Sequence, residues 1–240
     1  MKKKKRAHKF NRSLYTFFKK PFSQLLISLI ILFVARPYDR GAVYSVIWEF
    51  ALVMVFVSAI VNCHHSKAIK NTATIIGIPA IFCEWANFFY PDKSFITAFL
   101  ILMISFIFIT TASIIKQVVI NARVKLETLR GVVCAYFMVG IGFSLIYLLV
   151  NIVIPGSFQF SKPDILLKSD IYQLSHLMYF SFVTLLSIGY GDIVASKDFA
   201  QTCVIMQGMI GQFYIAILVS RLVGVYSFFE HKLHLIQGEK

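Results

Sequence analysis

Long apolar runs separated by short polar segments dominate this chain, and their apolar positions follow neither helical nor strand alternation. Six of the runs approach the about 20 residues that a helix needs to cross a membrane. The first run is short and requires flanking residues or local bilayer thinning to span. The predicted spans are 21–35, 41–63, 72–90, 95–115, 131–154 and 199–229. We therefore predict an all-α membrane protein with six transmembrane helices.

The positive charges give these spans an orientation. With the N-terminus inside, 18 Lys and Arg residues lie in inner segments and 6 lie in outer segments. This bias follows the positive-inside rule and predicts a multi-pass plasma-membrane protein with both termini in the cytoplasm. The basic N-terminal segment 1–20 can then contact anionic membrane lipid. Short loops and the lack of a disulfide pattern suit a bacterial inner membrane.

Composition excludes several other classes of protein. Soluble domains rarely reach 58% hydrophobic residues with only 15% charged residues. The net charge of +13 is concentrated in the N-terminal cluster and short loops, with no basic stripe on a readable fold motif, so we expect no nucleic acid partner. Widely spaced cysteines in apolar segments predict free thiols rather than a zinc site. These cysteines are Cys63, Cys83, Cys134 and Cys203.

A shorter apolar segment lies between the last two spans. In the predicted topology residues 155–198 are external, and residues 172–186 are too short to cross the membrane twice. We expect a re-entrant pore half-helix whose C-terminus points inward. Its dipole places partial negative charge toward the middle of the membrane, which favours a cation there.

The segment after this half-helix reads Ser187-Ile188-Gly189-Tyr190-Gly191-Asp192. Its two glycines stand at alternate positions, and glycine adopts left-handed backbone angles without steric cost. Alternating handedness turns successive carbonyl groups to one side, which a strand does not do. A column of carbonyl oxygens can replace the hydration shell of K⁺. Irregular backbone at membrane depth must line a pore or be buried in protein, so the segment predicts a selectivity-filter loop.

The run from Ser181 to Asp192 resembles the pore signature of the tetrameric potassium channel superfamily. Gly189 to Asp192 match that signature fully, whereas Ser187 and Ile188 replace the more usual threonine and valine. Residues 211–224 are similar to the inner helix of bacterial members. The close likeness covers 131–229, and residues 1–130 agree only in span count and orientation. The resemblance implies a six-transmembrane bacterial type with one pore loop per chain and a homotetrameric assembly.

We assign roles in the filter on these grounds. K⁺ is the permeant ion, and its ligands are expected to be the backbone carbonyls and the Ser187 hydroxyl. Tyr190 is expected to point its ring away from the ions and to pack it behind the filter, with its hydroxyl bonded to an aromatic residue such as Tyr179. Asp192 either attracts cations at the outer mouth or caps the following turn. The predicted ion-binding residues are Ser187, Ile188, Gly189, Tyr190 and Gly191, the last of which also turns the chain to the outer mouth.

Two glycines lie deep in the last span. Gly211 follows Asp192 at the offset where the family places a gating hinge, and Gly208 could serve instead. Glycine in a helix costs about 1 kcal/mol relative to alanine, so each of these glycines is expected to have a structural or functional role. The alternative to a hinge is close packing of helices.

The predicted domains follow from these features. Residues 21–116 are expected to form a four-helix, voltage-sensor-like membrane domain, 117–130 an amphipathic linker helix, 131–229 the pore domain and 230–240 a short cytoplasmic tail. The span 95–115 carries no charge, so it lacks the gating charges of a voltage sensor. Glu49 and Glu84 lie in spans and are either relics of counter-charges or a protonated, hydrogen-bonded pair.

These features predict passive potassium-selective conduction without strong voltage gating. The alternatives are a weakly selective monovalent cation channel, a potassium-uptake transporter subunit and a non-conducting regulatory subunit. An enzyme is not expected, because the chain has no HExxH, Gly-x-Ser-x-Gly or phosphate-binding glycine loop. No cofactor is expected beyond the permeant K⁺. Control by a ligand would have to come from the membrane part, the basic N-terminus or a separate regulatory subunit.

Overall fold

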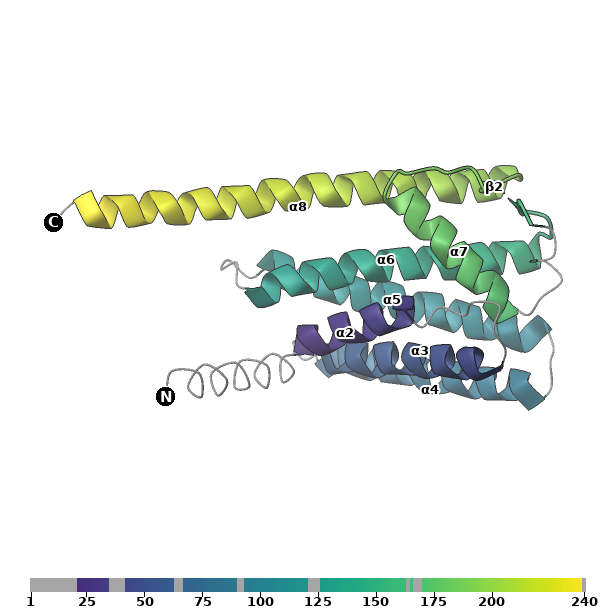
Figure 1. Cartoon of the computed structure of the whole chain (residues 1–240). Coiled ribbons are helices and arrows are strands. Elements are labelled where there is room, and N and C mark those ends of the chain that lie inside the picture. The colour runs from purple at the N-terminus through teal and green to yellow at the C-terminus, as the bar shows by residue number, and fades with distance from the viewer. Residues whose placement is uncertain are drawn as a thin grey trace, which may run out of the picture.

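Helices make up nearly all of the structure in Figure 1. This computed structural model describes residues 21–34, 42–62, 67–89, 93–120, 126–162, 165 and 170–238. The helices of these residues are α2 (Pro21–Val34), α3 (Ala42–Asn62), α4 (Lys67–Phe89), α5 (Lys93–Ile120), α6 (Leu126–Val153), α7 (Asp170–Leu185) and α8 (Asp198–Gly238). Two short strands, β1 (Phe158–Phe160) and β2 (Ile193–Ala195), pair antiparallel.

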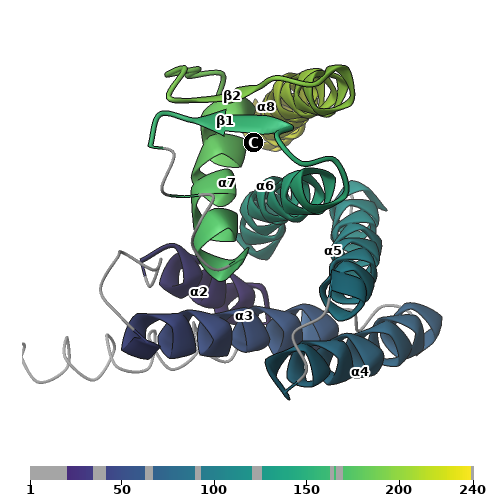
Figure 2. The ribbon, with the colours of Figure 1, turned by 90° about the vertical axis from the view of Figure 1, so that its right-hand side faces the viewer.

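Helix α6 is the centre of the packing. It contacts α2, α5, α7 and α8, and 72% of its most apolar stretch is buried. Figure 2 shows α6 between α5 and α7, with α2, α3 and α4 on one side of the molecule and α8 on the other. Helix α7 crosses α6 obliquely and reaches α8 with its C-terminal end (Figure 1). The half-length helix is therefore enclosed by longer helices on two sides.

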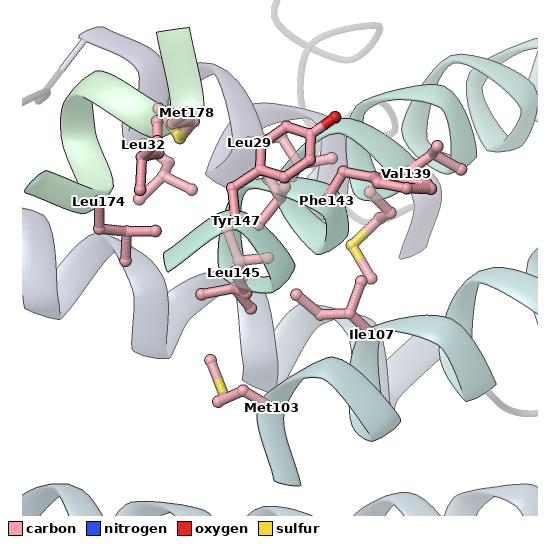
Figure 3. Packing of buried hydrophobic residues seen from close by; sticks show 14 of the residues in the cluster. Leu29, Leu32, Met103, Ile107, Val139, Phe143, Leu145, Tyr147, Leu174 and Met178 are labelled. Carbon is pink, nitrogen blue, oxygen red and sulfur yellow. The ribbon is translucent and has the colours of Figure 1, made fainter. Parts of the chain in front are cut away.

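The apolar core joins the first helices to the later ones. Phe33 of α2 makes edge contacts with Phe137 of α6 and Phe182 of α7, at ring-centroid distances of 5.3 and 4.5 Å. The part of the chain predicted as a sensor-like domain therefore packs directly on elements of the predicted pore domain. Figure 3 shows the middle of this core, with Leu29, Leu32, Met103, Ile107, Val139, Phe143, Leu145, Tyr147, Leu174 and Met178.

Three described helices contain segments long and apolar enough to cross a membrane. They are Lys93–Val118, Thr128–Val153 and Asp198–Ile217, and shorter apolar helices cover Phe22–Val34 and Phe50–Ile60. The structure thus agrees with an all-α membrane protein that carries one small antiparallel strand pair. Crossing by α2, α3 and α4, and hence the count of six spans, stays a prediction.

Two predicted boundaries differ from the helices observed. Helix α5 continues to Ile120 and α6 begins at Leu126, so most of 117–130 belongs to these two helices and forms no separate amphipathic helix there. Extending an existing helix is favourable residue by residue, whereas a new helix requires a costly nucleus. Helix α8 continues through the predicted tail to Gly238. At 1.5 Å per residue it is about 62 Å long, roughly twice the hydrocarbon thickness of a bilayer. Residues 1–20 and the side chains of Glu49 and Glu84 lie outside the described part.

Candidate functional site

The C-terminus of α7 ends in a Schellman motif that leads into the predicted filter. The Ile188 N–H donates to the Val183 carbonyl oxygen, and the Ser187 N–H donates to that of Thr184, both over 2.9 Å. Ser187 has φ 55°. This is the left-handed position that normally takes glycine in this motif. The pore half-helix predicted over 172–186 is therefore present, and its end fixes the start of residues 187–191, called here the filter segment.

Left-handed residues alternate along the filter segment. Ser187, Gly189 and Gly191 have φ of 55°, 64° and 77°. The predicted conformation of the two glycines is confirmed, whereas the left-handed backbone of Ser187 was not predicted. No residue type signalled it, because the left-handed position of a Schellman motif usually carries glycine and this chain has serine there. Alternating backbone of this kind turns successive peptide groups the same way.

The filter segment lies on an open face of the single chain. Residues 186–191 are all exposed, and Tyr190 is 68% exposed. The Tyr190 ring lies parallel to that of Tyr179, with 6.5 Å between the ring centroids and 4° between the planes. The two side chains are therefore neighbours, as expected, whereas the hydrogen bond of the Tyr190 hydroxyl stays a prediction.

The C-terminal end of the filter segment is held by the β-strand pair. The Asp192 carbonyl oxygen accepts hydrogen bonds from the N–H and the hydroxyl of Ser161, over 3.0 and 2.7 Å. Directly after Asp192, strand β2 pairs with β1 in the register Phe160 to Ile193. The backbone is thus fixed at both ends, by a helix cap on one side and by a sheet on the other.

The N-terminal end of the filter segment is held by α8 and α6. A Cβ atom at Gly211 would lie 2.7 Å from the Leu185 carbonyl oxygen, so α8 approaches the end of α7 as closely as a glycine allows. The same oxygen accepts a 3.0 Å hydrogen bond from the Tyr136 hydroxyl of α6. The next residue of α8, Gln212, donates its side-chain amide to the Ser187 hydroxyl oxygen over 2.5 Å. This contact was not predicted, because Gln212 had no assigned role.

A buried polar chain connects the three helices behind the segment. The Tyr147 hydroxyl donates to the Gln207 amide oxygen, and the Gln207 amide nitrogen donates to the Ser181 hydroxyl over 2.6 Å and to the Ser181 carbonyl oxygen over 3.1 Å. The Ser181 hydroxyl donates in turn to the Gly140 carbonyl oxygen over 2.6 Å. Tyr147, Ser181 and Gln207 are fully buried. A glutamine inside an apolar span was the signal for this network, because buried polar groups require partners.

A pair of tyrosines joins α6 to α8 through a hydrogen bond and a ring contact. The Tyr214 hydroxyl donates to the Val132 carbonyl oxygen over 2.7 Å. The rings of Tyr136 and Tyr214 lie 5.5 Å apart between centroids. Both side chains keep their apolar rings in the helix interface while their hydroxyl groups are satisfied, as buried tyrosine requires.

The two candidate hinge glycines have different surroundings. Gly211 is buried against Leu185, whereas a Cβ atom at Gly208 would meet nothing within 4 Å. Close packing therefore has direct support at Gly211. A hinge at either glycine stays a prediction.

Ionisable groups and thiols near the site do not form a metal centre in the described part of the chain. There, no group of three or more His, Cys, Asp or Glu residues could hold a metal ion. Asp170 begins α7, and burial raises the pKa of its carboxyl above the ordinary value. Cys83, Cys134 and Cys203 are free thiols, and Cys63 lies outside the described residues.

Comparison with known proteins agrees with this geometry. A family model described as "Ion channel" matches residues 164–227, which include α7, the filter segment and part of α8. Protein LctB of Bacillus caldotenax is 30% identical to the chain over 102 residues, which are 42% of this chain and 74% of that protein. No solved structure matches the chain. The half-helix, the alternating loop and the shared sequence together place the chain in the ion channel family.

Proposed function

We propose that this protein is a potassium-selective channel that conducts K⁺ passively through a homotetrameric pore. The observation that carries the proposal is the alternation of left-handed residues at Ser187, Gly189 and Gly191 directly after a half-length helix. This backbone can present successive carbonyl oxygens to one line of ions. Carbonyl oxygens bind K⁺ in place of water without adding net charge, so ions can also leave.

One chain supplies only one wall of such a pore. The exposed filter segment requires other copies of the chain to complete a ring around the ions, and the exposed apolar surface of α8 can pack against a neighbouring copy. Only 17% of the most apolar stretch of α8 is buried, and Ile205, Phe213 and Ile217 are each more than 60% exposed. Closed cyclic assembly buries one surface patch on every subunit and encloses an axis. Four copies, the number implied by the family resemblance, would surround the ions with carbonyl oxygens.

Weak voltage dependence follows from the lack of charged residues along most of α5. Between Ser94 and Ile115 this helix carries no Lys, Arg, Asp or Glu. Moving one elementary charge through the field yields about 2.3 kcal/mol per 100 mV, so a helix without charges in that region gains nothing by moving.

We propose a six-transmembrane type with both termini in the cytoplasm, located in a bacterial inner membrane.

A weakly selective monovalent cation channel is the second candidate. The feature that favours it is the serine at position 187, which is exposed and stands where the resembled channels usually have threonine. Serine lacks the methyl group that restricts the threonine side chain, so the innermost site is less rigid. A less rigid site would discriminate less between K⁺ and Na⁺.

Ion flux through purified protein in liposomes tests the proposal. Under a K⁺ gradient we expect flux that Ba²⁺ blocks, and a reversal potential near that of K⁺ in mixed K⁺ and Na⁺. Gly189→Ala should abolish the flux because alanine at φ 64° is strained.

The matched control is Gly156→Ala. Gly156 has φ 76° in the turn before β1, and a Cβ atom there would also meet nothing within 4 Å, so the substitution imposes similar strain outside the filter segment. It should keep the flux. Assembled wild-type protein without cation flux, or equal flux from both variants, would refute the proposal. A reversal potential midway between those of K⁺ and Na⁺ would select the weakly selective channel.

A further inference from the structure

One polar side chain of α8 reaches the inner end of the filter segment. The Gln212 amide nitrogen lies 2.5 Å from the Ser187 hydroxyl oxygen. The contact depends on the preceding residue, because only a glycine at 211 lets α8 approach Leu185 at the end of α7. Gln212 and Ser187 are both exposed in the single chain, on the side where the filter segment is open.

The bond changes what the Ser187 hydroxyl can offer to a cation. A hydroxyl oxygen carries one hydrogen and two lone pairs, and it rotates freely when it has no partner. A free hydroxyl can direct its hydrogen toward the ion, which opposes binding. With one lone pair held by the Gln212 amide, the rotation is restricted and the other lone pair keeps a defined direction.

The backbone at Ser187 restricts the same group from the other side. Its left-handed φ of 55° and the two hydrogen bonds of the Schellman motif fix the direction of the Cα–Cβ bond. Only rotation of the side chain about the Cα–Cβ bond and rotation of the hydroxyl group about the Cβ–Oγ bond then remain free. Gln212 supplies the single described contact that restrains the hydroxyl.

We propose that Gln212 is a specificity-determining residue of the pore. By orienting the Ser187 hydroxyl, it sets the ligand field of the innermost ion site. In a homotetramer, four such pairs form a ring at the inner end of the filter segment. This inference rests on the proposed channel function.

A merely structural contact between α8 and the loop makes a different prediction. Losing such a contact would lower the stability of the assembly and leave ion preference unchanged. Losing an orienting contact changes ion preference, and the change requires the Ser187 hydroxyl.

The test is a double-mutant cycle in liposomes and planar bilayers. We would measure the K⁺/Na⁺ permeability ratio and the half-blocking concentration of Ba²⁺ for the wild type, Gln212→Leu, Ser187→Ala and the double variant. Gln212→Leu is expected to raise the half-blocking concentration by about threefold to tenfold, the size of one hydrogen bond, and to lower the permeability ratio. In the Ser187→Ala background the same substitution should change neither quantity.

Two further variants complete the experiment. Gln201→Leu removes an amide that donates to the Ala195 carbonyl oxygen at the outer end of the same helix, so it should leave both quantities unchanged. Gln212→Glu keeps the size of the side chain and turns it into an acceptor with negative charge, so Ba²⁺ should block at lower concentration. If Gln212→Leu fails to assemble, this opposite shift carries the test through its reduction in the Ser187→Ala background, because an effect of charge alone would persist there.

If the wild type conducts but Gln212→Leu leaves the permeability ratio and Ba²⁺ block unchanged, the inference is overturned and the proposed function still stands. The same holds for an unchanged Ba²⁺ block in Gln212→Glu where that variant carries the test. An equal shift in the Ser187→Ala background would also overturn it. Assembled wild-type protein that passes no cation would overturn the proposed function itself.

Discussion

Gly211 of α8 and Leu185 of α7 touch where the half-helix ends. A Cβ atom at 211 would lie 2.7 Å from the Leu185 carbonyl oxygen and 2.9 Å from its Cδ1 atom. Distances this short are not found between real Cβ atoms and their neighbours, so the two helices must separate if any other residue stands there. The same carbonyl oxygen is held by Tyr136, which leaves it little freedom to move away.

Gly211→Ala is therefore expected to destabilise the protein, whereas Gly208→Ala is not. Overpacking of this kind costs about 1–3 kcal/mol. At Gly208 the new methyl group meets nothing within 4 Å, and helix propensity improves by about 1 kcal/mol. The apparent melting temperatures of the two assembled variants, measured in detergent, test this difference. Equal melting temperatures would contradict the packing account.

The hinge prediction is tested with the same pair of variants. A hinge at Gly211 predicts that Gly211→Ala changes the open probability and leaves K⁺/Na⁺ selectivity unchanged. Packing against Leu185 predicts that selectivity changes as well, because the start of the filter segment is displaced. Single-channel records in bilayers measure both quantities, and unchanged gating and conductance would exclude a hinge at this position.

The buried network should respond to the loss of either partner. Gln207→Leu leaves the buried Tyr147 hydroxyl without its acceptor, and Tyr147→Phe leaves the Gln207 amide oxygen without its donor. A buried group left unsatisfied costs about 1–3 kcal/mol. The double variant removes both groups and should cost less than the sum of the single variants. Thermal unfolding of the four proteins measures this coupling, and strict additivity would argue against it.

The left-handed backbone of Ser187 predicts an unusual order of substitutions. Glycine adopts φ near 55° freely, so Ser187→Gly should preserve the loop while removing the hydroxyl. Threonine is β-branched and is strained at positive φ, so Ser187→Thr should lower the melting temperature. An increase for Ser187→Thr would show that Ser187 is not left-handed in the working channel.

The carboxyl of Asp170 should make stability depend on pH. Burial raises its pKa in the folded protein, so the folded state favours the neutral carboxyl. The resulting stabilisation is complete below the ordinary aspartate pKa of about 4 and is lost as the pH rises through the raised pKa. Relative to Asp170→Asn, the wild type should therefore be more stable near pH 4 than near pH 7.

Melting temperatures of both proteins across that pH range provide the measurement. Asp198→Asn, at the exposed start of α8, serves as the control for a general effect of removing a carboxyl. A difference between wild type and Asp170→Asn that does not vary with pH would contradict the prediction.

Local features allowed much of this protein to be predicted from its residues. Length and apolarity predicted the long helices, since transfer of apolar surface and internal hydrogen bonding act within one segment. Gly189 and Gly191 predicted left-handed backbone because their conformational freedom is a property of the residue itself. The half-helix was predicted from the length of its apolar segment, which is too short to span a membrane.

The contacts between helices were decided by the tertiary structure. Nothing in the chain near residue 212 says that its amide meets Ser187, or that Gln207 meets Tyr147, 60 positions away. Such pairs depend on how far apart two helices lie and how each is rotated, which the packing of many distant side chains settles together. The sequence by itself determined most of the helical segments and the two glycine positions where the backbone becomes left-handed. The close approach of α8 to α7 determined which polar groups hold the turn in place.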